Sequence, residues 1–350
     1  MTVREAIEEL ELAPLLGHSV RETLARIDQL MHRIDPDSDP SLTLRLLLQR
    51  FRAAPPTARA IDQLATAEAW ASAEGLELER MRLQLLWCTT IGRHFPDAVP
   101  EDMLTDAVDR ARERGDLEAE WRLALAVCHP VQATTLRREA LALLTSPADD
   151  AVRIQTMLDL ADDYSRGSAD DAALETLERA VNLADQHPTS PLLCKALVRL
   201  SFALLLRGKR TRALPALQRA HAVSMELDDD LSIVMTGAPL AAIRLDEGDL
   251  DAAERIAERM LVSGARRGNW FAVVDAHITL SAIQLRSSGP TMAIAQLVQA
   301  VVGLRDLVPA AALNLLKGRL AELRNELGAH AFDSHYSSAV QQQEGAAPVN

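Results

Sequence analysis

A repeat of about 40 residues is the feature of this sequence that most restricts its fold. Leucine recurs at this interval at four positions, alanine at four others, and a third series holds three alanines and one methionine. Because three registers share one period over four copies, an array of similar units is expected instead of one compact globule. The three series are Leu160, Leu200, Leu240 and Leu280; Ala173, Ala213, Ala253 and Ala293; and Ala180, Ala220, Met260 and Ala300.

Each copy of the repeat has the residue spacing of two helices. Ala173 is followed by Leu177 and then by Ala180, and steps of four and three place side chains on one stripe of a helix. Small residues let two helices cross closely, with leucine filling the space beside them. The predicted antiparallel pairs are 149–166 with 170–187, 189–207 with 210–227, 229–247 with 250–265, and 269–287 with 290–306.

The composition agrees with helices and disfavours a large β-sandwich. Aromatic residues make up only 3% of the chain, whereas apolar residues reach 48%. A core of Leu, Ala, Val and Ile is typical of closely packed helices. The predicted fold class is therefore all-α: a right-handed α-solenoid of tandem antiparallel helix pairs with a period of about 40 residues.

The regular array does not cover the whole chain. Gly75 and Gly115 are separated by the same interval, but the step from Gly115 to Ala148 is shorter, so the pitch changes there. A solenoid needs end caps over its last apolar faces, and a segment without periodicity is expected to be disordered. The predicted parts are an N-terminal helical segment or cap (1–55), irregular helix pairs (56–148), four regular repeats (149–306), a C-terminal capping helix (307–328) and a disordered tail (329–350).

The pattern over 149–306 resembles the tetratricopeptide repeat. In that family a small residue is followed by an alanine twelve residues on, a large apolar residue four further and an alanine three further, as in Ala161, Ala173, Leu177 and Ala180. The period of this chain is longer than that of the family, which is about 34 residues. Longer units of this kind are similar to the sensor superhelix of bacterial regulators related to the maltose-regulon activator, and to peptide-binding quorum-sensing regulators.

The charge balance disfavours nucleic acid as a partner. The chain has 37 basic and 50 acidic residues and a formal net charge of −13, which repels a phosphate backbone. The segment Leu12–Arg26 faintly resembles a helix-turn-helix, with Gly17 in the turn and Ser19 capping the next helix. Pro14 interrupts its first helix, and residues 1–53 hold seven basic and nine acidic side chains. An N-terminal cap is the favoured interpretation, and DNA contact by this segment stays open.

The sequence contains no recognisable motif for a cofactor, metal or catalytic site. Lys209 follows a glycine but precedes Arg210, so no phosphate-binding loop is present. The nine histidines are dispersed. Cys88, Cys128 and Cys194 form no C-x-x-C pair, so buried reduced thiols are expected. The N-terminus lacks a signal-peptide pattern and no run of residues matches a membrane span, which predicts a soluble, cytoplasmic protein without membrane contact.

What remains is the surface of the array. In a helix-pair superhelix, the first helix of each pair lines the concave groove in which ligands are usually held. The face of those helices opposite the packed leucines and small residues carries charges of both signs. The sequence therefore predicts a partner-binding groove formed by Gln155, Asp159, Asp162, Arg166, Lys195, Arg199, Phe202, Met235, Asp275, Thr279 and Arg286.

These features predict a non-enzymatic scaffold, adaptor or sensor that binds a peptide or protein in the groove. Anchors such as Phe202 and Arg–carboxylate pairs would supply the affinity. The alternative is a transcriptional or quorum-sensing regulator in which a degenerate N-terminal helix-turn-helix is controlled by a bound peptide. A hydrolase or transferase would need convergent polar residues in a closed pocket, which an open helical array seldom provides. Self-association and the identity of the partner are open.

Overall fold

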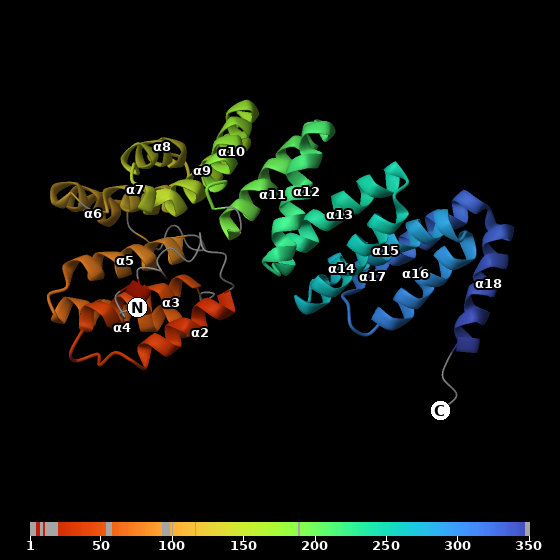
Figure 1. Cartoon of the computed structure of the whole chain (residues 1–350), viewed down its shortest axis with the longest axis horizontal. Helices are drawn as coiled ribbons and strands as arrows, with labels where there is room; N and C mark the ends of the chain where they lie inside the picture. The colour runs from red at the N-terminus through yellow and green to blue at the C-terminus, as the bar shows by residue number, and fades with distance from the viewer. Residues whose placement is uncertain are drawn as a thin grey trace. The chain divides into compact units, whose positions relative to one another are not determined.

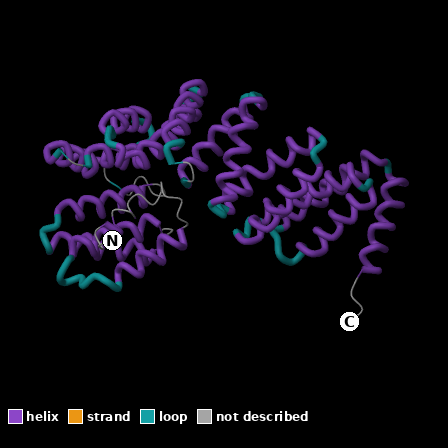
Figure 2. Tube along the Cα trace, in the orientation of Figure 1, coloured by secondary structure: helices purple, strands orange, loops and turns teal. Residues whose placement is uncertain are grey.

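The computed structural model describes residues 5–7, 10, 20–53, 58–92, 99, 101–115, 117–187 and 190–346. Every regular element in these ranges is a helix, as Figure 2 shows. The chain divides into two compact units, Met1–Gly208 and Lys209–Asn350. Residues 11–19, which hold most of the helix-turn-helix-like segment, lie outside the described residues.

The first unit is a series of helix pairs (Figure 1). We call the odd-numbered helices the first helices of the pairs and the even-numbered ones the second helices. Along the series of first helices, α3 contacts α5, α5 contacts α7 and α9 contacts α11. The helices are α2 (Val20–Met31), α3 (Pro40–Ala53), α4 (Ala58–Ala73), α5 (Glu77–Gly92), α6 (Glu101–Arg114), α7 (Glu118–Cys128), α8 (Ala133–Leu143), α9 (Asp150–Arg166), α10 (Asp170–Ala184) and α11 (Pro191–Leu206), with a 3-10 turn at Pro147–Asp149.

The second unit has the same construction. Each helix packs on its neighbour in sequence, and the first helices α13, α15 and α17 contact one another in turn. Its helices are α12 (Arg210–Glu226), α13 (Asp230–Glu247), α14 (Leu250–Arg266), α15 (Trp270–Ser287), α16 (Pro290–Leu304), α17 (Ala310–Leu327) and α18 (Ala329–Ala346).

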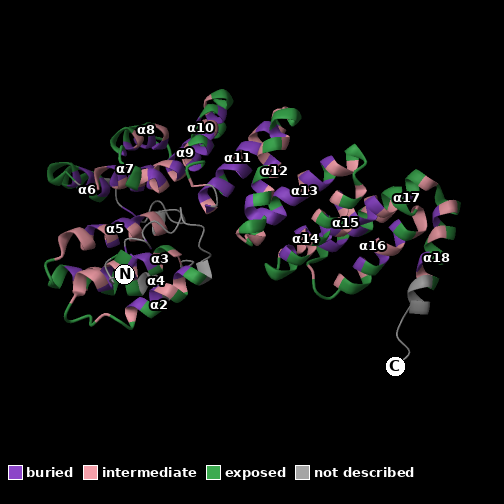
Figure 3. Cartoon of the chain, viewed as in Figure 1, coloured by how far each residue is buried: buried purple, intermediate pink, exposed green. Residues whose placement is uncertain are grey.

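These bounds confirm the predicted tetratricopeptide-like, all-α architecture of helix pairs. In the four regular repeats each predicted helix matches an observed one closely at both ends. All twelve members of the three repeat series are buried; the four leucines are 4–9% exposed and the other eight residues 0–3%. Figure 3 shows that buried and exposed residues alternate along the helices of the array. The residues that recur every 40 positions in the sequence are therefore residues that pack in the core of each copy.

Local signals set the helix ends. The side chains of Asp249 and Asn269 accept hydrogen bonds of 3.2 Å from the amides of Ala252 and Ala272 at the starts of α14 and α15. Such caps satisfy amides that have no partner inside the helix. Gly248, at the end of α13, has a φ of 82°, a left-handed conformation that glycine adopts without steric cost.

The prediction of a disordered tail from 329 is wrong for the described part of that segment. Residues 329–346 form α18, which packs on α16 and α17. Phe332 is 8% and Ala339 0% exposed, and these two residues lie seven apart on one face of the helix. With so few apolar residues the stripe is weak in the sequence, and only the packing surface of α16 reveals it. The other predicted domain boundaries stay predictions.

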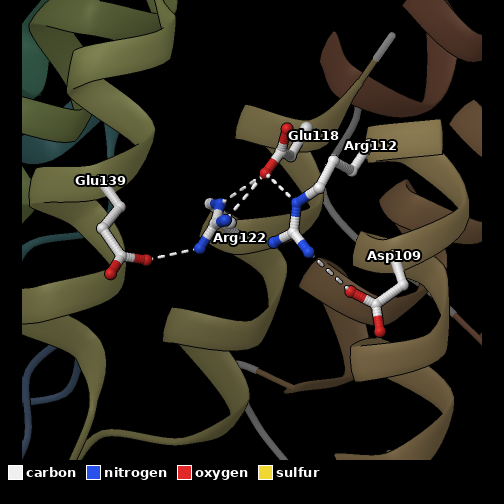
Figure 4. A network of polar contacts seen from close by, with 5 residues as sticks. All are labelled: Asp109, Arg112, Glu118, Arg122 and Glu139. Atoms are coloured by element: carbon white, nitrogen blue, oxygen red, sulfur yellow. Dashed lines mark hydrogen bonds and ion pairs between the residues drawn. The ribbon is translucent and has the colours of Figure 1, made fainter. Parts of the chain in front are cut away.

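Charged side chains join α6 to α7 and α7 to α8 in the first unit. Figure 4 shows Arg112 of α6 and Arg122 of α7 converging on Glu118, whose Oε1 accepts from Arg112 Nε at 3.0 Å and from Arg122 Nη2 at 2.7 Å. Arg122 also bonds Glu139 on α8. The hydrogen bond from Arg122, followed by that from Arg112, lowers the pKa of the Glu118 carboxyl.

A buried ion pair joins α8 to α9. Arg137 Nη1 bonds Asp163 Oδ2, and the two side chains are 9% and 4% exposed. Arg166 bonds the other oxygen of Asp163. A buried charge is tolerated when its partner is in place, and removing one partner leaves the other unpaired.

We expect Asp163→Ala to destabilise the protein by about 3–5 kcal/mol, because it strands the buried guanidinium of Arg137. Urea unfolding followed by circular dichroism measures this change. The neighbouring Asp162→Ala is the control, since Asp162 is 51% exposed and an exposed pair contributes about 0–1 kcal/mol. Equal effects of the two variants would show that the Arg137–Asp163 pair does not stabilise the α8–α9 joint.

Gly237 marks a close approach of α13 and α14. A Cβ added at this glycine would lie 2.4 Å from Cγ of Met260. Gly237→Ala should therefore destabilise the second unit by about 1–3 kcal/mol through overpacking. Gly318→Ala in α17, where an added Cβ meets nothing within 4 Å, should instead stabilise by up to about 1 kcal/mol. A gain of stability in both variants would contradict the close crossing.

Candidate functional site

The first helices of the first unit form a hollow of about 390 Å³ that is open to solvent. We call it the first-helix groove. It is lined by α3, α5, α7, α9 and α11, with one residue from α8. The lining residues are Arg52, Leu85, Leu86, Thr89, Glu120, Leu123, Val127, Arg137, Ala151, Val152, Gln155, Thr156, Asp159 and Leu192.

Helical spacing explains why these residues share one face. On α9, Val152, Gln155, Thr156 and Asp159 follow one another at steps of three, one and three, which places them on a single stripe. On α7 the lining residues are 120, 123 and 127, again one stripe. The opposite faces of these helices carry the packed core, so the groove face is left to the solvent.

Glu120 is the most unusual polar residue of the groove. Its side chain is partly buried, and no ion pair to it exists within the described ranges of the chain. Burial, with a smaller effect of the charge of Asp149, raises the pKa of the Glu120 carboxyl, while its own backbone amide and the charges of Arg82 and Arg52 oppose the shift. The groove therefore holds a carboxylate whose desolvation the neighbouring charges do not fully offset.

The structure brings part of the predicted set together. Gln155 and Asp159 line the groove, and Gln155 Nε2 donates to Asp159 Oδ1 at 2.7 Å. Lys195 Nζ donates to Gln155 Oε1 at 2.6 Å, from α11 to α9. Arg199 bonds Asp162 and also donates to the carbonyl of Leu158 at 3.1 Å. These charged side chains join two first helices, which sequence reasoning did not anticipate.

Other predicted residues lie elsewhere. Arg166 bonds Asp163, and Phe202 is half-buried on α11. Met235 on α13 is 40% exposed, and Asp275 on α15 lies at the surface, although desolvation by its neighbours raises the pKa of its carboxyl. Thr279 is half-buried, and Arg286 bonds the carbonyl of Leu245. The last four residues belong to the second unit.

Two sets of surface residues were missed. The first set, Glu120, Leu123 and Val127, lies before residue 149, in the part of the chain where the 40-residue period is irregular. The spacing of three and four residues between them could still have identified one face of a helix. Leu231 and Phe271 are 43% and 51% exposed. They lie one turn before Met235 and Asp275 and are separated by the interval of the repeat, so the repeat itself could have identified them.

Several titratable groups outside the groove have pKa values shifted by burial. Burial, with a smaller effect of Cys128, raises the pKa of the Cys88 thiol to about 12, so this cysteine is a thiol at neutral pH and a poor nucleophile. Burial also lowers the pKa values of His221 and His277, which bond Thr236 and Gln296 at 2.9 Å. The described residues contain no group of three or more potential metal ligands.

Among the helices that the structure describes, none is both long and apolar enough to cross a membrane. No family model and no curated protein matches the chain.

Solved structures of helical proteins do match. BtubC (BKLC) from P. vanneervenii has 19% identity over 64% of this chain and 91% of its own, with a TM-score of 0.45. A Rap protein complexed with Competence and Sporulation Factor has 16% identity over 98% of both chains and a TM-score of 0.46. Aspartyl phosphate phosphatase F from Bacillus subtilis has 15% identity over 97% of this chain and 93% of its own, with a TM-score of 0.43. At these identities and TM-scores the likeness carries no statement about the function of this chain.

Replacing Glu120 by Gln should stabilise the protein at neutral pH, because the folded state must ionise a carboxyl whose pKa burial has raised. The wild type loses stability relative to E120Q as the pH rises from the pKa of unfolded glutamate, about 4.3, through the higher pKa of the folded state. The difference is constant above that window and vanishes below it. Urea unfolding between pH 3.5 and pH 8 (roughly the range that brackets this titration) measures it.

The exposed Glu175→Gln on α10 is the control for that series. A gain in E120Q that does not change with pH, or the same gain in both variants, would show that the raised pKa of Glu120 does not govern stability.

Proposed function

We propose that this protein is a non-enzymatic scaffold, adaptor or sensor that binds a peptide, or an extended segment of a protein, in the first-helix groove. The observation that carries the proposal is the partly desolvated carboxylate of Glu120, which has no ion-pair partner among the described residues, within a mainly apolar hollow. A cationic group of a ligand placed beside Glu120 would stabilise its ionised carboxylate, which burial in the free protein disfavours.

The lining suggests how such a segment is held. Leu85, Leu86, Leu123 and Val152 offer apolar contact from three neighbouring first helices. A basic side chain of the ligand would pair with Glu120, and Asp159 on α9 provides a second acceptor in the same hollow. Affinity from a few anchors in a preformed surface is the usual pattern of such interfaces.

The charge of the whole chain supports the same kind of ligand. A formal net charge of −13 attracts cationic segments over a distance and raises their rate of association. The hollow of about 390 Å³ lies near the lower end of ligand pockets, about 300–1,000 Å³. It fits the side chains of a short segment better than a folded domain, so we propose a peptide that combines a basic residue with large apolar residues.

The predicted groove residues of the second unit would form a separate contact surface for a partner. Met235 and Asp275 adjoin the exposed Leu231 and Phe271, at equivalent positions on α13 and α15. Apolar side chains of this exposure beside a carboxyl suit the same ligand chemistry. The regulator alternative, with its helix-turn-helix and its similarity to maltose-activator sensors, stays a prediction of the sequence.

Selection from a phage-displayed library of random linear peptides tests the proposal. We expect the protein to enrich peptides that have one Lys or Arg among large apolar residues. Glu120→Lys should weaken binding of a selected, fluorescently labelled peptide by at least about tenfold, because it places like charges in contact. Fluorescence anisotropy measures the dissociation constant.

Glu175→Lys makes the same charge change at an exposed position of the second helix α10 and should leave binding nearly unaltered. Enrichment of acidic peptides, or equal losses in E120K and E175K, would show that the first-helix groove is not the binding site.

A further inference from the structure

A second cavity lies between α4, α5, α6 and α7 and has a volume of about 360 Å³. We call it the indole pocket, because Trp87 and the buried Trp121 line it. Leu64 and Leu83 add buried apolar surface, and Met103, 37% exposed, borders it. Two of the four tryptophans of a chain with only 3% aromatic residues thus gather around one cavity.

The indole pocket is separate from the first-helix groove. On α5 the pocket is lined by residues 83, 84, 87 and 88, whereas the groove is lined by 85, 86 and 89. At about 100° per residue these two sets face opposite sides of the helix. A ligand in the pocket therefore contacts a different surface from the proposed peptide, and the present inference does not rest on the proposed function.

The polar groups of the pocket indicate the charge of its ligand. Glu68 is the one carboxylate in the lining. Its Oε1 already accepts a hydrogen bond of 3.0 Å from Gln84 Nε2 and lies 4.0 Å from Nε of Arg80. Arg110, exposed on α6, has no partner among the described residues. The Nε1–H of Trp121 is buried and finds no acceptor in the part of the chain that the structure describes.

A buried donor without an acceptor is unfavourable, and an unpaired guanidinium beside an apolar cavity suits a planar carboxylate. We propose that the indole pocket binds a small aromatic or branched aliphatic carboxylate. Its apolar body lies against Trp87, Leu64 and Leu83, and its carboxylate pairs with Arg110. A volume near the lower end of ligand pockets fits one ring with a short side chain.

The probe for this site is 3-phenylpropionate, and its neutral amide is the matched compound. Isothermal titration calorimetry on the full chain should show that the acid binds at least about tenfold more tightly than the amide, since one charge-assisted contact to Arg110 distinguishes them. Binding of the acid should also change the fluorescence of Trp87 and Trp121, which line the pocket.

Two variants test the place of binding. Arg110→Gln should remove the preference for the acid over the amide. Ala65→Trp should abolish binding of both compounds, because Ala65 lines the pocket and is exposed, so an indole there fills its entrance. Ala73→Trp, an exposed position two turns further along α4 and outside the lining, should bind as the wild type does.

Circular dichroism shows whether each variant is folded, and the comparison of acid with amide on the wild type needs no variant. Absence of binding to the wild type, equal affinity for the acid and the amide, or an unchanged preference in R110Q would overturn the proposal. Undiminished binding in folded A65W would also overturn it, by placing the ligand elsewhere.

Discussion

The close contact of small side chains where helices cross is the interaction on which both units depend. Ala213 and Ala253 are fully buried at equivalent positions of successive repeats, and Gly237 lets α13 approach Met260 of α14. A side chain that ends at Cβ allows two backbones to come close, and leucines then interdigitate beside the crossing. Contacts between first helices follow within each unit: α3 with α5, α5 with α7 and α9 with α11 in the first, and α13 with α15 and α15 with α17 in the second.

Polar bonds along that face hold successive first helices together. Arg199 donates to the carbonyl of Leu158, and Arg286 to that of Leu245, each over 41 residues. A hydrogen bond from an arginine to a backbone carbonyl of the preceding first helix thus occurs in both units. It also engages charged side chains that sequence reasoning had assigned to a partner. The groove that remains is mainly apolar, and Glu120 in its lining has no ion-pair partner among the described residues.

The helices α5 and α7 contribute to two cavities. Leu85 and Glu120 belong to the first-helix groove, and Trp87 and Trp121 to the indole pocket. These helices lie in the part of the chain where the period is irregular. Within the described ranges, the two cavities differ in the polar group that lacks a counterpart: a carboxylate without a cation in the groove, and two donors without an acceptor in the pocket. This difference is why we propose ligands of opposite charge for them.

The fold class and the helix boundaries of the four regular repeats follow from the amino-acid order alone. Small and apolar residues at steps of three and four form one face of a helix, and the constant interval between copies makes the helices an array. Helix α18 escaped prediction because Phe332 and Ala339 are a stripe too sparse to recognise without the surface of α16. The groove and the pocket were decided only by tertiary packing. The partners of a surface charge lie on other helices, so only the folded chain distinguishes Arg199, which is bonded, from Glu120 and Arg110, which have no ion-pair partner among the described residues.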